Sequence, residues 1–122
     1  MNLFLDSSAL VKLYVEEPDS ALVRAWVDGA DVVSACRIAW AEIQAALAAR
    51  ERLGTVASGP DVIQALRLDW PRFAKVEITQ PLVERAGEFA HAFALRGYDS
   101  VQLAAVDLLH RAERQPVAFG CF

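Results

Sequence analysis

Short apolar runs alternate along the chain with longer segments in which apolar residues recur every three or four positions. The runs have the length of buried strands and stand at 3–5, 31–35, 75–78 and 116–122. Helical spacing marks the segments 8–15, 20–28, 38–53, 61–70, 80–95 and 100–114. One strand followed by two helices, repeated along the chain, favours an α/β fold with a central parallel sheet flanked by helices.

Two of these segments carry further expectations. The segment 100–114 is almost entirely apolar until His110, which predicts a central, buried helix. The segment 116–122 begins a fourth strand on which the sequence stops. A strand with no element to cover it predicts a truncated C-terminus. The length suits one domain over 1–122.

Composition narrows the class of protein. Apolar residues make up 55% of the chain, which suits a sheet buried on both faces, a large partner interface, or both. No apolar run approaches the roughly 18 residues of a membrane span. The N-terminus carries Asp6 where a signal peptide has an apolar core. We therefore predict a cytoplasmic protein without a membrane segment.

The net charge of −4 bears on the partners of the protein. It argues against a broad basic surface for nucleic acids. It is compatible with a nucleic-acid enzyme whose site is itself acidic, because metal ions can then meet the phosphates.

Three carboxylates stand where strands end or helices begin. Asp6 follows the first strand, Glu42 lies in the first turns of the helix after the second strand, and Asp99 precedes the apolar helix. The carboxyl ends of parallel strands share one edge of a sheet, where open α/β folds bind ligands. We therefore expect the three acids to meet. Converging carboxylates suit the hard cations that assist phosphodiester hydrolysis.

Each acid also has a purely structural interpretation. Asp6 and Asp99 are good helix N-caps, with Gln102 placed as a capping-box partner of Asp99. Glu42 stands in an apolar run and could simply face solvent. We exclude Asp107 from the site because it lies eight residues beyond Asp99, about 12 Å along the helix axis. The site interpretation therefore depends on the three acids meeting.

Smaller and basic groups accompany the acids. Ser8 stands two residues after Asp6 and could orient that carboxylate. Lys12, Arg37 and Arg96 are the basic residues nearest the predicted edge in sequence, and they could guide phosphates. Alternatively, they pair with acids on the surface.

Three motifs follow one another at a characteristic spacing: Leu5-Asp6-Ser7-Ser8-Ala9-Leu10, Trp40-Ala41-Glu42, and Leu95-Arg96-Gly97-Tyr98-Asp99-Ser100-Val101-Gln102-Leu103-Ala104-Ala105. Together they resemble PIN-domain ribonucleases, and among these the VapC-type toxins of bacterial toxin–antitoxin pairs. The resemblance spans essentially the whole chain.

This resemblance implies a three-layer α/β sandwich, with 1–122 as a single PIN domain, and Mg²⁺- or Mn²⁺-dependent hydrolysis of RNA. It implies that Asp6, Glu42 and Asp99 are the catalytic metal ligands and that Ser8 lies beside the metal. Its implied partners are an RNA substrate, a VapB-type antitoxin and a second copy of the chain in a homodimer. The family often has a fourth acid just after the last strand, so we expect that last element and its acid to be missing beyond Phe122.

Two other functions stay open. An acid-pocket phosphatase or receiver-like protein would use Asp6 as a nucleophile, but it would carry a second acid where Ser8 stands. A catalytically impaired PIN module would only bind a protein partner. Binding of Mn²⁺ separates a nuclease-like site from such an interaction module.

Overall fold

The computed structural model describes residues 1–55 and 59–122, in which strands and helices alternate as the pattern predicts. The strands are β1 Asn2–Leu5, β2 Val32–Cys36, β3 Ala74–Val76 and β4 Val117–Gly120. The helices are α1 Ser7–Leu10, α2 Ser20–Asp28, α3 Ala39–Arg52, α4 Gly59–Asp69, α5 Gln80–Phe93 and α6 Gly97–Ala112. Two 3₁₀ turns, η1 Val11–Leu13 and η2 Trp70–Arg72, extend α1 and α4.

The strands form one parallel sheet in the order β3-β2-β1-β4. In its register, Leu3 of β1 lies opposite Val33 of β2 on one side and Ala118 of β4 on the other. The chain runs outward from β1 to β2 and β3, and then returns past β1 to β4. The order of the strands therefore reverses at β1. Open α/β sheets bind ligands outside the carboxyl ends of the strands at such a reversal.

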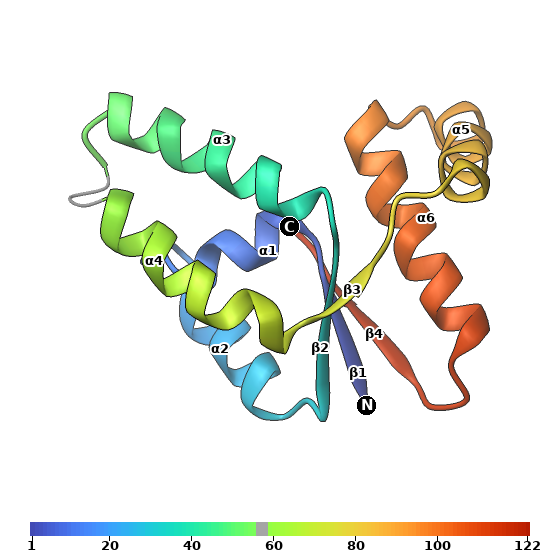
Figure 1. The fold of residues 1–122 in the computed structure, drawn as a ribbon, viewed down its shortest axis with the longest axis horizontal. Coiled ribbons are helices and arrows are strands. Elements are labelled where there is room, and N and C mark those ends of the chain that lie inside the picture. The colour runs from blue at the N-terminus through green and yellow to red at the C-terminus, as the bar shows by residue number, and fades with distance from the viewer. Residues whose placement is uncertain (56–58) are drawn as a thin grey trace.

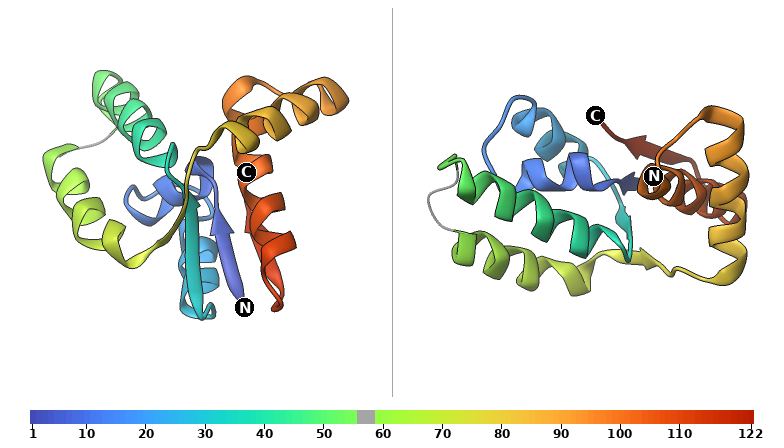
Figure 2. Two further views of the ribbon diagram at one scale, coloured as in Figure 1. Left: turned by 45° about the vertical axis from the view of Figure 1, so that its right-hand side comes forward. Right: turned by 90° about the horizontal axis from the view of Figure 1, so that it is seen from above.

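Helices cover both faces of the sheet, with α1–α4 on one side and α5 and α6 on the other (Figure 1; further views in Figure 2). Right-handed crossovers require this arrangement, because connections that run in opposite directions along a sheet lie on opposite faces. β1 contributes to both cores: Leu3 and Leu5 pack toward α1–α4, whereas Phe4 packs toward α5 and α6. This alternation follows the two-residue period of a strand. The expected three-layer α/β fold is confirmed.

One helix is less buried than its composition predicts. α6 buries Gln102, Val106 and the small residues between them against α5 and the sheet. Its outer flank faces solvent, so that Leu108 is 41% exposed. The sequence did not indicate this amphipathicity, because apolar residues stand on both the buried and the exposed face of α6. In the described part of the chain, no helix combines the length and the apolar character that a membrane crossing needs.

Candidate active site

Asp6 directly follows β1 and serves as the N-cap of α1. Its Oδ1 accepts hydrogen bonds from the Ser8 hydroxyl at 2.6 Å and from the Ala9 amide at 3.1 Å. Its own amide donates to the Gly120 carbonyl of β4 at 3.2 Å, which fixes the strand exit against the neighbouring strand. The capping interpretation of Asp6 is therefore correct. It does not compete with a role in the site, because both hydrogen bonds fall on one of the two carboxylate oxygens.

Glu42 lies in the first turn of α3 and is held from the other side of the sheet. Its Oε1 accepts a hydrogen bond of 2.7 Å from Nε2 of Gln102 on α6. Gln102 is only 3% exposed, and within the described residues its Oε1 is a buried oxygen without a hydrogen-bond partner. The sequence had suggested only a capping role for Gln102. Its position one helical turn after Asp99, on the same face of α6, is the signal that could have placed Gln102 near the site.

Asp99 lies in the first turn of α6, where Arg96 donates from Nε to its Oδ2 at 3.1 Å. Its side chain is half exposed. Asp99 and Glu42 line a cavity of about 560 Å³ together with Arg96, Gly97, Tyr98 and Val101. The beginnings of α3 and α6 thus place two of the acids on one surface depression.

The charges of the three acids influence one another. Burial raises the pKa of the Asp6 carboxyl, and the charge of Asp99 raises it further, against the hydrogen bonds that lower it. Burial also raises the pKa of Glu42, and the charges of Asp6 and Asp99 add to this effect. The structure therefore brings the three acids to one edge of the sheet. The ionised forms of Asp6 and Glu42 are disfavoured there as long as no cation balances them.

The residues present fit a hard divalent cation by their chemistry. Carboxylate oxygens are the ligands that Mg²⁺ and Mn²⁺ take in proteins. In residues 1–55 and 59–122, however, no three His, Cys, Asp or Glu side chains already form a ligand cage. Asp99 is turned toward the Arg96 guanidinium instead. Its half-exposed side chain has room to take another rotamer.

The raised pKa values predict a pH dependence of stability in the absence of divalent cations. A carboxyl group whose pKa is higher in the folded state binds more protons there, so its contribution to the free energy of unfolding falls as the pH rises from about 4 toward its folded pKa. A Glu42→Gln variant lacks this penalty. In EDTA, its melting temperature relative to the wild type should therefore increase with pH over that range. Thermal unfolding from pH 4 to 7 measures the difference, and a pH-independent difference would contradict the prediction.

The accessory residues lie around these acids in different roles. The Ser8 hydroxyl donates to Asp6 and accepts from the Phe122 amide at 2.9 Å, so it connects the carboxylate with the end of β4. Arg96 lies at the cavity with a largely exposed side chain. Arg37 is paired with Glu77 on the surface, as the alternative interpretation had it.

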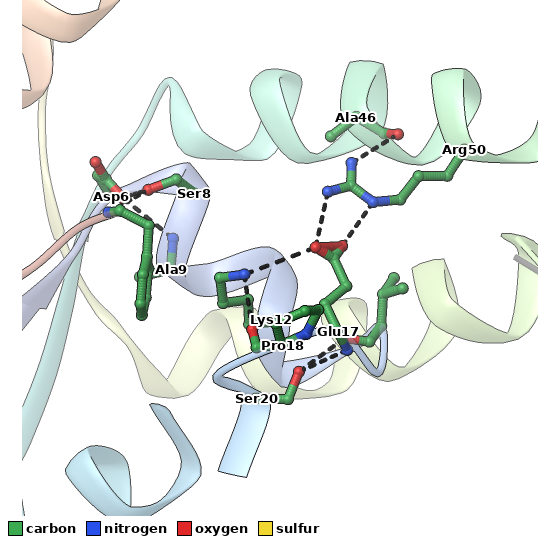
Figure 3. A network of polar contacts seen from close by, with 11 residues as sticks. Asp6, Ser8, Ala9, Lys12, Glu17, Pro18, Ser20, Ala46 and Arg50 are labelled. Carbon is green, nitrogen blue, oxygen red and sulfur yellow. Dashed lines mark hydrogen bonds and ion pairs between the residues drawn. The ribbon is translucent and has the colours of Figure 1, made fainter. Parts of the chain in front are cut away.

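Lys12 belongs to an internal polar network. Its Nζ donates to the Pro18 carbonyl at 2.9 Å and lies 3.7 Å from the Glu17 carboxylate (Figure 3). Glu17 is in turn bound by the guanidinium of Arg50 on α3, at 2.6 and 3.1 Å. This network fastens the connection between α1 and α2 to α3. The Lys12 ammonium group also lies 4.8 Å from the centre of the Phe122 ring, and the Lys12 side chain is only 13% exposed.

The chain matches a known family model and is similar to two curated proteins. Residues 3–113 match the family model described as PIN domain. Two curated proteins of Mycobacterium tuberculosis, named Ribonuclease VapC45 (strain CDC 1551 / Oshkosh) and Ribonuclease VapC49 (strain ATCC 25618 / H37Rv), are each 40% identical to this chain over 106 residues. In both, the match covers 84% of this chain and 72% of the relative.

Solved structures share the fold at lower identity. Mycobacterium tuberculosis VapC20, described as a sarcin–ricin loop cleaving toxin, has a TM-score of 0.69 and 17% identity, over 88% of this chain and 82% of that protein. A toxin–antitoxin complex from Klebsiella pneumoniae has a TM-score of 0.64 and 20% identity, over 91% of this chain and 82% of that chain. VapBC2 from Rickettsia felis, bound to a DNA fragment from its promoter, has a TM-score of 0.63 and 12% identity, over 99% of this chain and 100% of that chain.

Proposed function

The chain belongs to the PIN-domain family, and we propose that it is a VapC-type ribonuclease that hydrolyses RNA phosphodiester bonds with Mg²⁺ or Mn²⁺. The observation that supports this proposal is that Asp6, Glu42 and Asp99 lie near enough to one another, at the carboxyl edge of the sheet where the strand order reverses, for the charges of Asp6 and Asp99 to raise the pKa of Glu42. Such a group of acids is unfavourable in an empty site and favourable around a cation. The 40% identity to two proteins named as ribonucleases supports RNA as the substrate.

Asp6, Glu42 and Asp99 would hold the cation, and their surroundings prepare two of them for it. Oδ1 of Asp6 is occupied by Ser8 and Ala9, and Oε1 of Glu42 is occupied by Gln102. These hydrogen bonds hold both carboxylates in place at the edge of the sheet. Donors that orient ligating groups in this way also raise metal affinity.

A bound divalent cation supplies Lewis acidity, which activates water and stabilises negative charge on the phosphate oxygens. The chain itself contributes positioning. Arg96, which is largely exposed beside the cavity, can donate to a phosphate oxygen once RNA competes with Asp99 for its guanidinium. Hydrolysis by in-line attack of water would leave a 5′-phosphate and a 3′-hydroxyl.

We assign to the protein the role of toxin in a toxin–antitoxin pair, with a VapB-type antitoxin as its partner. Two proteins of the same fold were solved in complexes described as a toxin–antitoxin complex and as VapBC2. The same proposal includes a homodimer. It also includes a cytoplasmic location, because the protein would meet both its RNA substrate and its antitoxin there.

The ribonuclease activity is tested with a fluorescein-labelled RNA pool of random sequence. We expect cleavage in Mg²⁺ or Mn²⁺, loss of cleavage in EDTA, and recovery when the cation is added back in excess. Products should carry a 5′-phosphate, which makes them substrates for a 5′-phosphate-dependent exonuclease. Equal cleavage with and without EDTA would contradict a metal-dependent mechanism, and binding of Mn²⁺ without any cleavage would favour an impaired interaction module.

A further inference from the structure

We propose that Tyr98 is a stacking platform for one unpaired RNA base beside the phosphate that is cut. This inference rests on the proposed ribonuclease function and adds a binding subsite to it. Its ligand is a nucleobase in a single strand, loop or bulge, bound through its flat face rather than through a base-specific set of hydrogen bonds.

The first observation is that the Tyr98 ring is exposed and has no aromatic neighbour. It is 63% exposed. Two other aromatic side chains are comparably open, and each lies against a second ring: Phe93 against Phe89 and Phe122 against Trp26. Within the described residues, Tyr98 has neither a partner ring nor a hydrogen bond from its hydroxyl. Its ring is therefore available to a ligand.

The second observation is where this ring stands. A single exposed apolar side chain is ordinary on a protein surface. Tyr98, however, lines the same cavity as Glu42 and Asp99, and it immediately precedes Asp99. A phosphate held at the acids thus brings the base of the same or the next nucleotide within reach of the Tyr98 ring.

The chemistry of the cavity favours a nucleotide as the occupant. The acids, through the cation that they are proposed to hold, would bind a phosphate. The exposed Arg96 lines the same cavity. An aromatic face next to a phosphate-binding group is the usual combination in sites for single-stranded nucleic acid. A base inside a duplex already stacks on its neighbours, so only an unpaired base can use the ring.

The test compares Tyr98→Ala, Tyr98→Phe and wild type in steady-state cleavage of a single-stranded RNA oligonucleotide. Removing a stacking ring weakens binding by about 5- to 150-fold, so we expect KM to rise by that factor in Tyr98→Ala with a smaller change in kcat. Tyr98→Phe retains the ring and should stay within about twofold of wild type. Phe93→Ala is the matched control, because Phe93 is 61% exposed and lines a different cavity.

Oligonucleotides with one abasic position identify the base that stacks. If Tyr98 holds a base, one abasic position near the cut should weaken wild type and leave Tyr98→Ala unchanged, because both changes remove the same contact. The same comparison is made by fluorescence anisotropy in an Asp6→Asn background, where binding is measured without cleavage.

The outcomes separate the two proposals. Failure of wild type to cleave RNA overturns the ribonuclease function, and with it the subsite that rests on it. Cleavage by wild type with equal KM in Tyr98→Ala overturns the stacking platform alone. A Tyr98→Ala defect of the same size with every abasic oligonucleotide also overturns it, since the ring would then act on the fold rather than on a base.

Discussion

Replacing Asp6 with Asn should reduce RNA cleavage by at least about a hundredfold while leaving the fold intact. The charge of one carboxylate around a catalytic cation is worth several kcal/mol in the transition state, and about 1.4 kcal/mol corresponds to a factor of ten. The fold should persist because Asn caps helices about as well as Asp, so that the bond to the Ala9 amide can be kept. Loss of the Asp6 charge also removes one of the repulsions that raise the pKa of Glu42.

Two measurements and a control make this prediction specific. Cleavage rates are compared at saturating Mg²⁺, and the rise in melting temperature on addition of Mn²⁺ reports cation binding without any turnover. Asp61→Asn carries the same chemical change in the first turn of α4, on an exposed site, and should behave as wild type in both. Undiminished cleavage by Asp6→Asn would remove Asp6 from the catalytic site.

Replacing Gln102 with Leu should lower both cation affinity and cleavage by about 10- to 100-fold, as is usual when a partner that orients a metal ligand is removed. Leu is apolar and cannot donate to Glu42, whose Oε1 is then left without its 2.7 Å hydrogen bond. The stability of the protein should change little, because the substitution also removes the unpaired Oε1 of Gln102 from the interior.

Titration with Mn²⁺, followed by the EPR signal of the free ion, measures the affinity of the Gln102→Leu variant directly. Gln64→Leu provides the same change at an exposed position on α4. A Gln102→Leu protein that loses activity but binds Mn²⁺ like the wild type would show that Gln102 acts on something other than the carboxylate. A large fall in melting temperature would show that its role is in folding.

The sequence predicted the parts of this molecule that depend on local patterns. Apolar runs and helical spacing located the strands and helices, and the rule for strand ends in parallel sheets brought Asp6, Glu42 and Asp99 to one edge. Asp6 shows why the two interpretations of an acid need not be alternatives: one carboxylate oxygen caps α1 and the other stays free of those bonds.

What the sequence did not predict depends on contacts between distant segments. The bond from Gln102 to Glu42 joins residues 60 positions apart, and no local pattern specifies it. Lys12 looked like a residue that guides phosphates because it stands near Asp6 in sequence. The turn after η1 instead brings Glu17 and Pro18 next to the Lys12 ammonium group. The solvent-exposed flank of α6 was also missed, since the elements that pack against a helix with many apolar residues decide which of them are buried.

The pairing of β1 with β4 has a consequence for synthesis of the protein on the ribosome. Asn2 lies opposite Val117, and Asp6 is hydrogen-bonded to Gly120, so this edge of the sheet joins two segments that lie far apart in the sequence. A nascent chain that still holds residues 117–120 in the exit tunnel cannot complete this edge. At about 5–20 residues per second, residue 120 is made about 6 to 23 s after Asp6. The strand exit that carries Asp6 therefore takes its final form only after β4 has been released from the ribosome.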